Sequence, residues 1–333
     1  MTLGSMSELA ITDTVEAALV IANVHGRVAA IDSRLRTELA RGTIVKLRRG
    51  LYARRELWSA LTPTQRYQAF VIGVARSGQI MPVLSHASAA VLHGLPRIEA
   101  WPGDVHELVD RCSGGRSAPG RQRHAVGIDD VDVIRRDGLY LTSIERTVVD
   151  VAATSSTFSA VAAIDAALHV DRFGTTPAMT TMTALLSTWE RMLPFRGSAR
   201  ARQLIEFGDR RSGSVNESNS RVTMAQLGLP VPELQRSWRI DGAEYDADFY
   251  FVGADAIGEA DGKAKYSDPL LLAGRSPADV VYGEKRREDA LRRRVSAFAR
   301  WDYAVGMSRS LLGSRLAEIG VLPTERPRLR ATR

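Results

Sequence analysis

The C-terminal third of the chain alternates between apolar and polar positions in a way that predicts β-strands. Aromatic, aliphatic and small residues recur at every second position, and Gly, Pro or Asp separate the segments. Asp241-Gly242 lies between the first two segments and is a hairpin turn signal. Three segments show this alternation: residues 234–240, 244–251 and 256–261. The pattern predicts neighbouring antiparallel strands.

Helical periodicity surrounds these strands. Ser214 can cap a helix that ends at the Gly- and Pro-containing segment 228–232. Residues 278–294 predict a long helix whose mixed charges fall at helical spacing, so we expect an exposed, ion-paired face there. A fourth strand is expected near residues 298–305, and a last helix at 311–319.

The first 60 residues predict three helices followed by a hairpin. Apolar residues at helical spacing predict a first helix over 12–22, which Thr12-Asp-Thr14 can cap. The spacing predicts two more helices, at 28–31 and at 34–40, and Gly42 ends the last one. Two strands follow, residues 43–47 and 51–53, on either side of Arg48-Arg49-Gly50. This order describes a winged helix-turn-helix.

Positive charge gathers on this module. The whole chain carries a formal net charge of +7, which favours a polyanionic partner. The basic residues fall on the third predicted helix and the hairpin tip, the elements that would meet the major groove and the flanking phosphates of double-stranded DNA. The alternative to DNA binding is that these basic residues only form a solvated face of the protein. The candidate DNA-binding residues are Arg34, Arg36, Arg41, Lys46, Arg48 and Arg49.

Residues 61–155 mix helices and short strands. A helix begins with Thr62 as cap and Pro63 in its first turn, and a small-residue helix closes at Gly94. His86 and His93 on the latter are seven apart, which does not match metal ligands four apart, so we expect them to be structural. Capping-box spacing at 142–145 predicts another helix. Short strands are expected at 105–109, 123–126 and 139–141.

The first half resembles the AbiEi family, antitoxins of bacterial abortive-infection toxin–antitoxin systems. Three motifs in order carry the resemblance: LRRGLYA at 47–53, LSHASAAVLHGL at 84–95 and LTSIERTVVD at 141–150. The resemblance implies a winged helix-turn-helix that represses its own operon. It also implies a following domain that contributes to antitoxicity toward a nucleotidyltransferase-like toxin.

Acidic residues gather in the predicted C-terminal sheet. Glu259 and Asp261 are two apart on one strand, a hairpin would bring Asp248 or Asp246 close to Glu259, and Glu217 lies on the preceding helix. Such oxygens suit a hard cation, so Asp248 and Glu259 are candidate Mg²⁺ ligands. The arrangement resembles the PD-(D/E)XK nuclease superfamily, in particular its very-short-patch-repair-like branch. The residues that match are Glu217, Asp248, Glu259, Asp261 and Gly262.

That resemblance implies a metal-dependent endonuclease. The chain departs from the superfamily's residue pattern at one position. The superfamily usually has Lys two residues after the second acid, where this chain has Asp261. Lys263 or Lys265 would have to supply the electrostatic assistance of that lysine instead. Two functions therefore remain open: an AbiEi-type DNA-binding repressor and antitoxin that needs no cofactor to bind DNA, or a Mg²⁺-dependent DNA endonuclease.

The expected protein is a multi-domain α+β protein of 333 residues. Cys112 is the single cysteine, which excludes an intramolecular disulfide and a cysteine zinc site. No apolar run reaches membrane-spanning length, so we expect a cytoplasmic protein without a membrane partner. Five segments are expected: a winged helix-turn-helix at 1–60, an α/β AbiEi-like domain at 61–155, a helical connector at 156–211, a restriction-endonuclease-like α/β domain at 212–320 and a basic disordered tail at 321–333.

Overall fold

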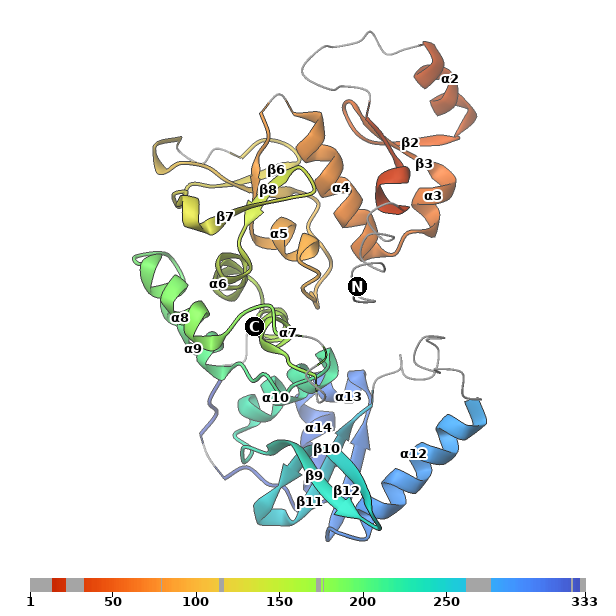
Figure 1. The fold of residues 1–333 in the computed structure, drawn as a ribbon, viewed down its shortest axis with the longest axis vertical. Coiled ribbons are helices and arrows are strands. Elements are labelled where there is room, and N and C mark those ends of the chain that lie inside the picture. Colours follow the sequence, from red (N-terminus) through yellow and green to blue (C-terminus); the bar gives the residue numbers. More distant parts are fainter. Residues whose placement is uncertain are drawn as a thin grey trace. The chain divides into compact units, whose positions relative to one another are not determined.

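The structure is a computed structural model in which two compact units are distinguished (Figure 1). It describes residues 14–21, 33–78, 80–113, 117–171, 175, 177–261, 277–324 and 326–329. Unit 1 comprises Met1–Ser155 and Met182–Gln203, and unit 2 comprises Ser156–Thr181 and Leu204–Arg333. The described residues form a mixed α+β protein with three separate sheets. None of their helices is long and apolar enough to cross a membrane.

The first sheet of unit 1 has three antiparallel strands in the order β1-β3-β2. Its strands are β1 (Leu19–Ile21), β2 (Ile44–Arg48) and β3 (Leu51–Arg54). Helix α2 (Ser33–Arg41) precedes β2, and helix α3 (Arg55–Ala60) follows β3. Gly50 closes the β2–β3 hairpin with φ of +79°, a left-handed conformation that glycine adopts without steric cost.

One predicted helix of this module is wrong in its second half. Residues 19–21 were expected to continue the first helix, but they form β1 and pair with residues 51–53 of β3. Val20 and Ile21 are β-branched and favour a strand once a partner strand is available. The predicted helix at 28–31 lies outside the described residues.

The second sheet of unit 1 has five strands in the order β6-β5-β4-β8-β7. Its strands are β4 (Val83–Leu84), β5 (Val105–Leu108), β6 (Arg121–His124), β7 (Val133–Arg136) and β8 (Leu139–Thr142). The helices of this part are α4 (Pro63–Ser77), α5 (His86–Leu92), α6 (Ile144–Thr154) and α8 (Met182–Arg191). The pairs β4–β8 and β5–β6 are parallel, whereas β4–β5 and β7–β8 are antiparallel.

Capping residues set two of these helix starts. Thr62 caps α4, as the sequence predicts, and it also forms a complete capping box with Gln65. At α6 the prediction was one residue off, because Ser143 rather than Thr142 accepts the hydrogen bond from the Arg146 amide. The Thr142 hydroxyl instead lies 2.7 Å from the Thr147 hydroxyl in the interior.

Unit 2 contains a four-stranded sheet in the order β12-β11-β10-β9. Its elements follow the chain as α10 (Val215–Leu227), β9 (Glu233–Ile240), β10 (Ala243–Phe251), β11 (Ala256–Ala260), α12 (Pro277–Arg292), β12 (Ala297–Trp301), α13 (Tyr303–Met307) and α14 (Arg309–Ala317). Strands β9, β10 and β11 are antiparallel neighbours, and β12 runs parallel to β11. The predicted fourth strand is shorter than expected, because Asp302 caps α13 directly after it.

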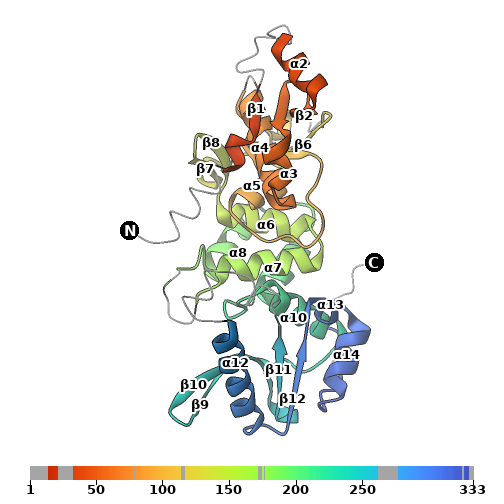
Figure 2. The ribbon, with the colours of Figure 1, turned by 90° about the vertical axis from the view of Figure 1, so that its right-hand side faces the viewer.

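Helices cover both faces of this sheet, and Figure 2 shows α12 and α14 on either side of the β11–β12 pair. On one face Phe249 and Trp301 pack with Met224 of α10 and Leu312 of α14. On the other face apolar residues of β10 and β11 pack with Leu291 of α12. A sheet with two buried faces explains why all five residues of β11 are buried.

The expected helical connector at 156–211 is divided between the units. Helix α7 (Thr157–Leu168) belongs to unit 2, where Asp165 forms an ion pair of 2.5 Å with Arg221 of α10. Helix α8 and the first part of α9 (Ser198–Phe207) belong to unit 1. The connector therefore contributes buried residues to both units, such as Leu185 in unit 1 and Ile164 in unit 2.

The end of the chain also differs from the expected disordered tail. Within its described part, the amide of Arg328 donates to the carbonyl of Ala225, and its guanidinium donates to the carbonyl of Leu229. Leu329 is only 3% exposed. These contacts hold residues 326–329 against the C-terminal end of α10, because the buried Leu329 offsets the entropy of ordering the segment.

Candidate functional site

The basic residues of α2 lie on its exposed surface. Arg34, Arg36 and Arg41 are all exposed, as the DNA-binding prediction requires. Arg34 Nε lies 3.2 Å from Glu38 Oε1, an i,i+4 pair that is worth little in solvent. Helix α2 leads directly into β2, and the Thr43 amide donates to the Glu38 carbonyl at 3.1 Å. The helix therefore presents its arginines next to the hairpin.

The β2–β3 hairpin exposes two of its three candidate DNA contacts. Lys46 and Arg49 are exposed, but Arg48 is only partly exposed and its Nη1 atom is buried without a hydrogen-bond partner. A Cβ at Gly120 would lie 3.4 Å from this Nη1, so Arg48 reaches back toward β5 and β6. Burial lowers the pKa of Arg48, the charge of Arg121 lowers it further, and Glu107 opposes both. This placement does not suit the DNA contact expected for Arg48.

In unit 2 the predicted acids come from one helix and two adjacent strands. The β10–β11 register pairs Phe249 with Gly258, so the next pair is Asp248 with Glu259. Asp248 and Glu217 share a bridging amide: Gln235 Nε2 donates to Glu217 Oε2 at 3.0 Å and to Asp248 Oδ1 at 3.3 Å. Glu217 and Asp248 therefore lie close together, each within hydrogen-bonding distance of the same amide nitrogen.

The pKa of the Glu217 carboxyl is strongly raised. Its side chain is 7% exposed, and burial together with the charge of Asp248 raises the pKa of the Glu217 carboxyl to about 7. The Gly213 amide donates to Glu217 Oε2 at 3.0 Å, which opposes this rise by stabilising the ionised form. Gln235, which bridges the two acids, has φ of +51°, a strained value for a non-glycine residue.

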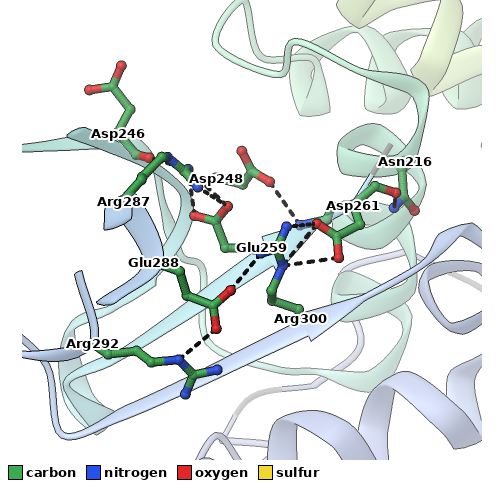
Figure 3. A network of polar contacts seen from close by, with 10 residues as sticks. Asn216, Asp246, Asp248, Glu259, Asp261, Arg287, Glu288, Arg292 and Arg300 are labelled. Carbon is green, nitrogen blue, oxygen red and sulfur yellow. Dashed lines mark hydrogen bonds and ion pairs between the residues drawn. The ribbon is translucent and has the colours of Figure 1, made fainter. Parts of the chain in front are cut away.

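Glu259 is neutralised by an arginine (Figure 3). Arg287 on α12 places Nη1 3.0 Å from Glu259 Oε2, and Nη2 3.0 Å from Oε1. The same Nη2 donates to the carbonyl oxygen of Asp246 at 2.7 Å. Because Glu259 is only 3% exposed, this bidentate pair supplies the cation that its buried charge requires.

Asp261 belongs to a second, separate arginine network. Arg300 Nε lies 3.0 Å from each carboxylate oxygen of Asp261, and Arg300 Nη1 lies 2.6 Å from Glu288 Oε2. Figure 3 shows the Asp261–Arg300 pair and the Glu259–Arg287 pair as distinct contacts. Gly262, Lys263 and Lys265 lie outside the described residues.

The described acids Asp248 and Glu259 already have polar partners in this arrangement. Arg287 contacts both oxygens of Glu259, and Asp248 Oδ2 accepts the Ala260 amide at 2.8 Å. Among the residues that the structure describes, no group of three or more His, Cys, Asp or Glu is arranged to hold a metal ion. Glu259 is thus paired with the Arg287 guanidinium, and Asp248 accepts the Ala260 amide.

Arg287 and Arg300 were missed at the sequence level. The charges of 284–289 were expected on an exposed face, yet Arg287 reaches the sheet. A signal was present, because Arg287 lies four residues before Leu291, and residues four apart share one face of a helix. Leu291 is fully buried, so Arg287 lies on the side of α12 that faces β10 and β11.

Comparison with known proteins gives partial matches. The chain is similar to the uncharacterized proteins MT2308 and Rv2248 of Mycobacterium tuberculosis, with 33% identity over 110 residues in each case. The match covers 28% of this chain and 39% of each relative. No protein-family model matches the chain, and no solved structure matches it.

Proposed function

We propose that unit 1 binds double-stranded DNA through α2 and the β2–β3 hairpin, and that the chain acts as a regulator of the AbiEi antitoxin type. The observation that supports this most directly is the exposure of five of the six candidate basic residues on two adjoining elements. An exposed helix with an exposed arginine-bearing hairpin beside it suits a groove and its flanking phosphates. The resemblance of the three AbiEi-like motifs supports autorepression and a nucleotidyltransferase-like toxin as partner.

The contacts in unit 2 favour a binding or structural role for its nuclease-like elements. Glu259 and Asp261 each pair with an arginine, so their negative charge is already compensated. The Glu259–Arg287 pair connects β11 to α12, and removing one partner of such a buried pair is strongly destabilising. In this proposal unit 2 does not cut the duplex.

DNA binding is tested by the salt dependence of affinity for a duplex from the promoter of the protein's own operon. We expect the full chain to bind. The double variant Arg36→Ala with Arg49→Ala should bind more weakly, and the negative slope of log K against log salt should become less steep by about 1 per lost phosphate contact. Arg48→Ala should change the slope less, because Arg48 turns toward β5 and β6. Arg315→Ala, at an exposed position of unit 2, is the matched control. An unchanged slope in the double variant would refute the proposed interface.

A Mg²⁺-dependent endonuclease is the second candidate. Its supporting observation is that Glu217, Asp248 and Glu259 come from one helix and two adjacent strands, as the PD-(D/E)XK resemblance requires. Incubation of supercoiled plasmid with the protein and Mg²⁺ or Mn²⁺ tests it. Nicking by the wild type that disappears in a Glu259→Ala variant shown to be folded would favour this function over a purely binding role.

A further inference from the structure

A histidine cluster in unit 1 takes no part in the proposed function. The rings of His86 and His124 are stacked with centroids 3.6 Å apart, and His106 Nδ1 lies 2.9 Å from His124 Nε2. The sequence predicts that His86 and His93 are structural residues. His93 Nε2 lies 2.9 Å from the carbonyl oxygen of Thr142, in a separate structural contact.

Burial keeps the three clustered imidazoles neutral. It lowers the pKa of His86 to about 3, with further lowering by the charges of His106 and Arg146. Burial likewise lowers the pKa of His106 and of His124 to about 4. A neutral imidazole carries one hydrogen-bond donor and one acceptor, so the cluster presents both kinds of group near neutral pH.

Asp150 joins this cluster to a chain of buried charges. Its Oδ2 lies 3.7 Å from His86 Nδ1, and Arg146 Nε lies 3.2 and 3.3 Å from its two oxygens. Arg146 Nη1 also lies 3.0 Å from Asp132, which pairs with Arg191. Apolar side chains of the same volume are often at least as stabilising as buried ions, so stability alone does not account for this chain.

Two adjoining cavities lie along these charges. The larger, of about 570 Å³, is lined by His86, His124 and Asp150, and the smaller measures about 250 Å³. Met192 and Phe195 line both cavities. Their charged lining residues are Arg111, Arg146, Arg191, Arg196, Asp129, Asp132 and Asp150. Four arginines against three aspartates leave the lining with a positive balance.

The backbone of His86 gives an independent indication of a ligand site. Its φ is +49°, in the left-handed region that non-glycine residues seldom adopt. Such strain costs on the order of 1–3 kcal/mol and is typical of residues that a binding or catalytic site holds in place. His86 is 6% exposed and is the residue through which the histidine cluster meets Asp150.

We propose that unit 1 binds a small anion with a heterocyclic ring, of the size of a nucleoside monophosphate. The ring lies in the larger cavity between Phe195 and the His86–His124 stack, where imidazole and carboxylate groups read the donors and acceptors on its edge. The anionic group lies against Arg196, because guanidinium groups bind phosphate oxygens in a bidentate way. A cavity of about 570 Å³ is within the range of small-molecule sites.

Isothermal titration calorimetry of the full chain tests this site with AMP, GMP, CMP and UMP, with the free nucleosides and with inorganic phosphate. We expect at least one nucleoside monophosphate to bind with a Kd below about 1 mM, and more tightly than its nucleoside or phosphate alone. Met192→Trp, which fills the space between the cavities, and Arg196→Glu, at an exposed position, should each weaken binding at least about tenfold. Arg135→Glu, at an exposed position of β7, is the matched control and should bind as the wild type does.

Several results would overturn the proposal. They are the absence of binding by every nucleotide at this affinity, equal binding of phosphate alone, or wild-type affinity in a folded Met192→Trp or Arg196→Glu variant. Circular dichroism establishes that the variants are folded, and Arg196→Glu decides the outcome if Met192→Trp does not fold. DNA binding does not enter this experiment, so the ligand site and the DNA interface are tested separately.

Discussion

Glu217 should make unit 2 less stable as the pH rises, and Glu217→Gln should remove this effect. The carboxyl has a pKa of about 7 in the folded chain against an ordinary value of 4.5. Since a tenfold change in an equilibrium is about 1.4 kcal/mol, holding the ionised form in the folded state costs about 3 kcal/mol. Glu217 is 7% exposed, so solvent screens little of this cost.

The sign follows from proton binding. Between pH 4.5 and about 7 the folded state keeps a proton on Glu217 that the unfolded state has lost. The contribution of the neutral carboxyl is therefore complete below pH 4.5 and is lost as the pH rises through about 7. Glutamine has a similar shape and no charge, so Glu217→Gln should raise the free energy of unfolding of unit 2 by about 2–3 kcal/mol more at pH 8 than at pH 5.

Urea unfolding at the two pH values measures this difference. Hydrogen exchange of peptides from α10 reports the unfolding of unit 2 separately from that of unit 1. Glu318→Gln is the control, because Glu318 is exposed and its pair with Arg315 at 3.4 Å contributes little. A Glu217→Gln effect that is the same at pH 5 and pH 8 would refute the argument that burial and Asp248 raise the pKa of this carboxyl.

Two further predictions concern the packing of the same sheet. Arg287→Met should destabilise unit 2 by about 3–5 kcal/mol because Glu259 stays buried without its cation, and adding Glu259→Leu should recover part of this loss in the same urea experiment. Gly258→Ala should cost about 1–3 kcal/mol, since a Cβ there would lie 2.5 Å from the Trp301 ring, which Ser220 holds at 2.8 Å. Gly253→Ala, with nothing within 4 Å of the added Cβ, is its control, and equal melting midpoints for the two alanine variants would contradict the steric reasoning.

Local signals in the sequence determined where several elements begin and end. Ser214 caps α10 as predicted, and Gly228 ends it with φ of +68°. Asp241-Gly242 forms the predicted hairpin turn, with both residues at positive φ. These features depend on residues that are close in the chain, so the sequence contains all the information that they need.

The acidic site could be predicted in part for the same reason. Two-residue periodicity and the hairpin turn are local properties that bring Asp248 or Asp246 near Glu259, and the observed register selects Asp248. The bridge from Gln235 to Glu217 did not follow, because it depends on how α10 packs on β9 and β10. Periodicity predicts which face a residue occupies, whereas the contact that it makes depends on the element packed against that face.

Only the tertiary structure decided the partners of the buried charges. Arg287 and Glu259 are 28 residues apart, and His86 meets His124 and Asp150 through the packing of α5, β6 and α6. Residues 19–21 became a strand because β3 offered them hydrogen bonds, although their own spacing favoured a helix. Burial makes an unpaired charge or backbone group costly, so such groups take the partner that the fold brings near, wherever it lies in the sequence.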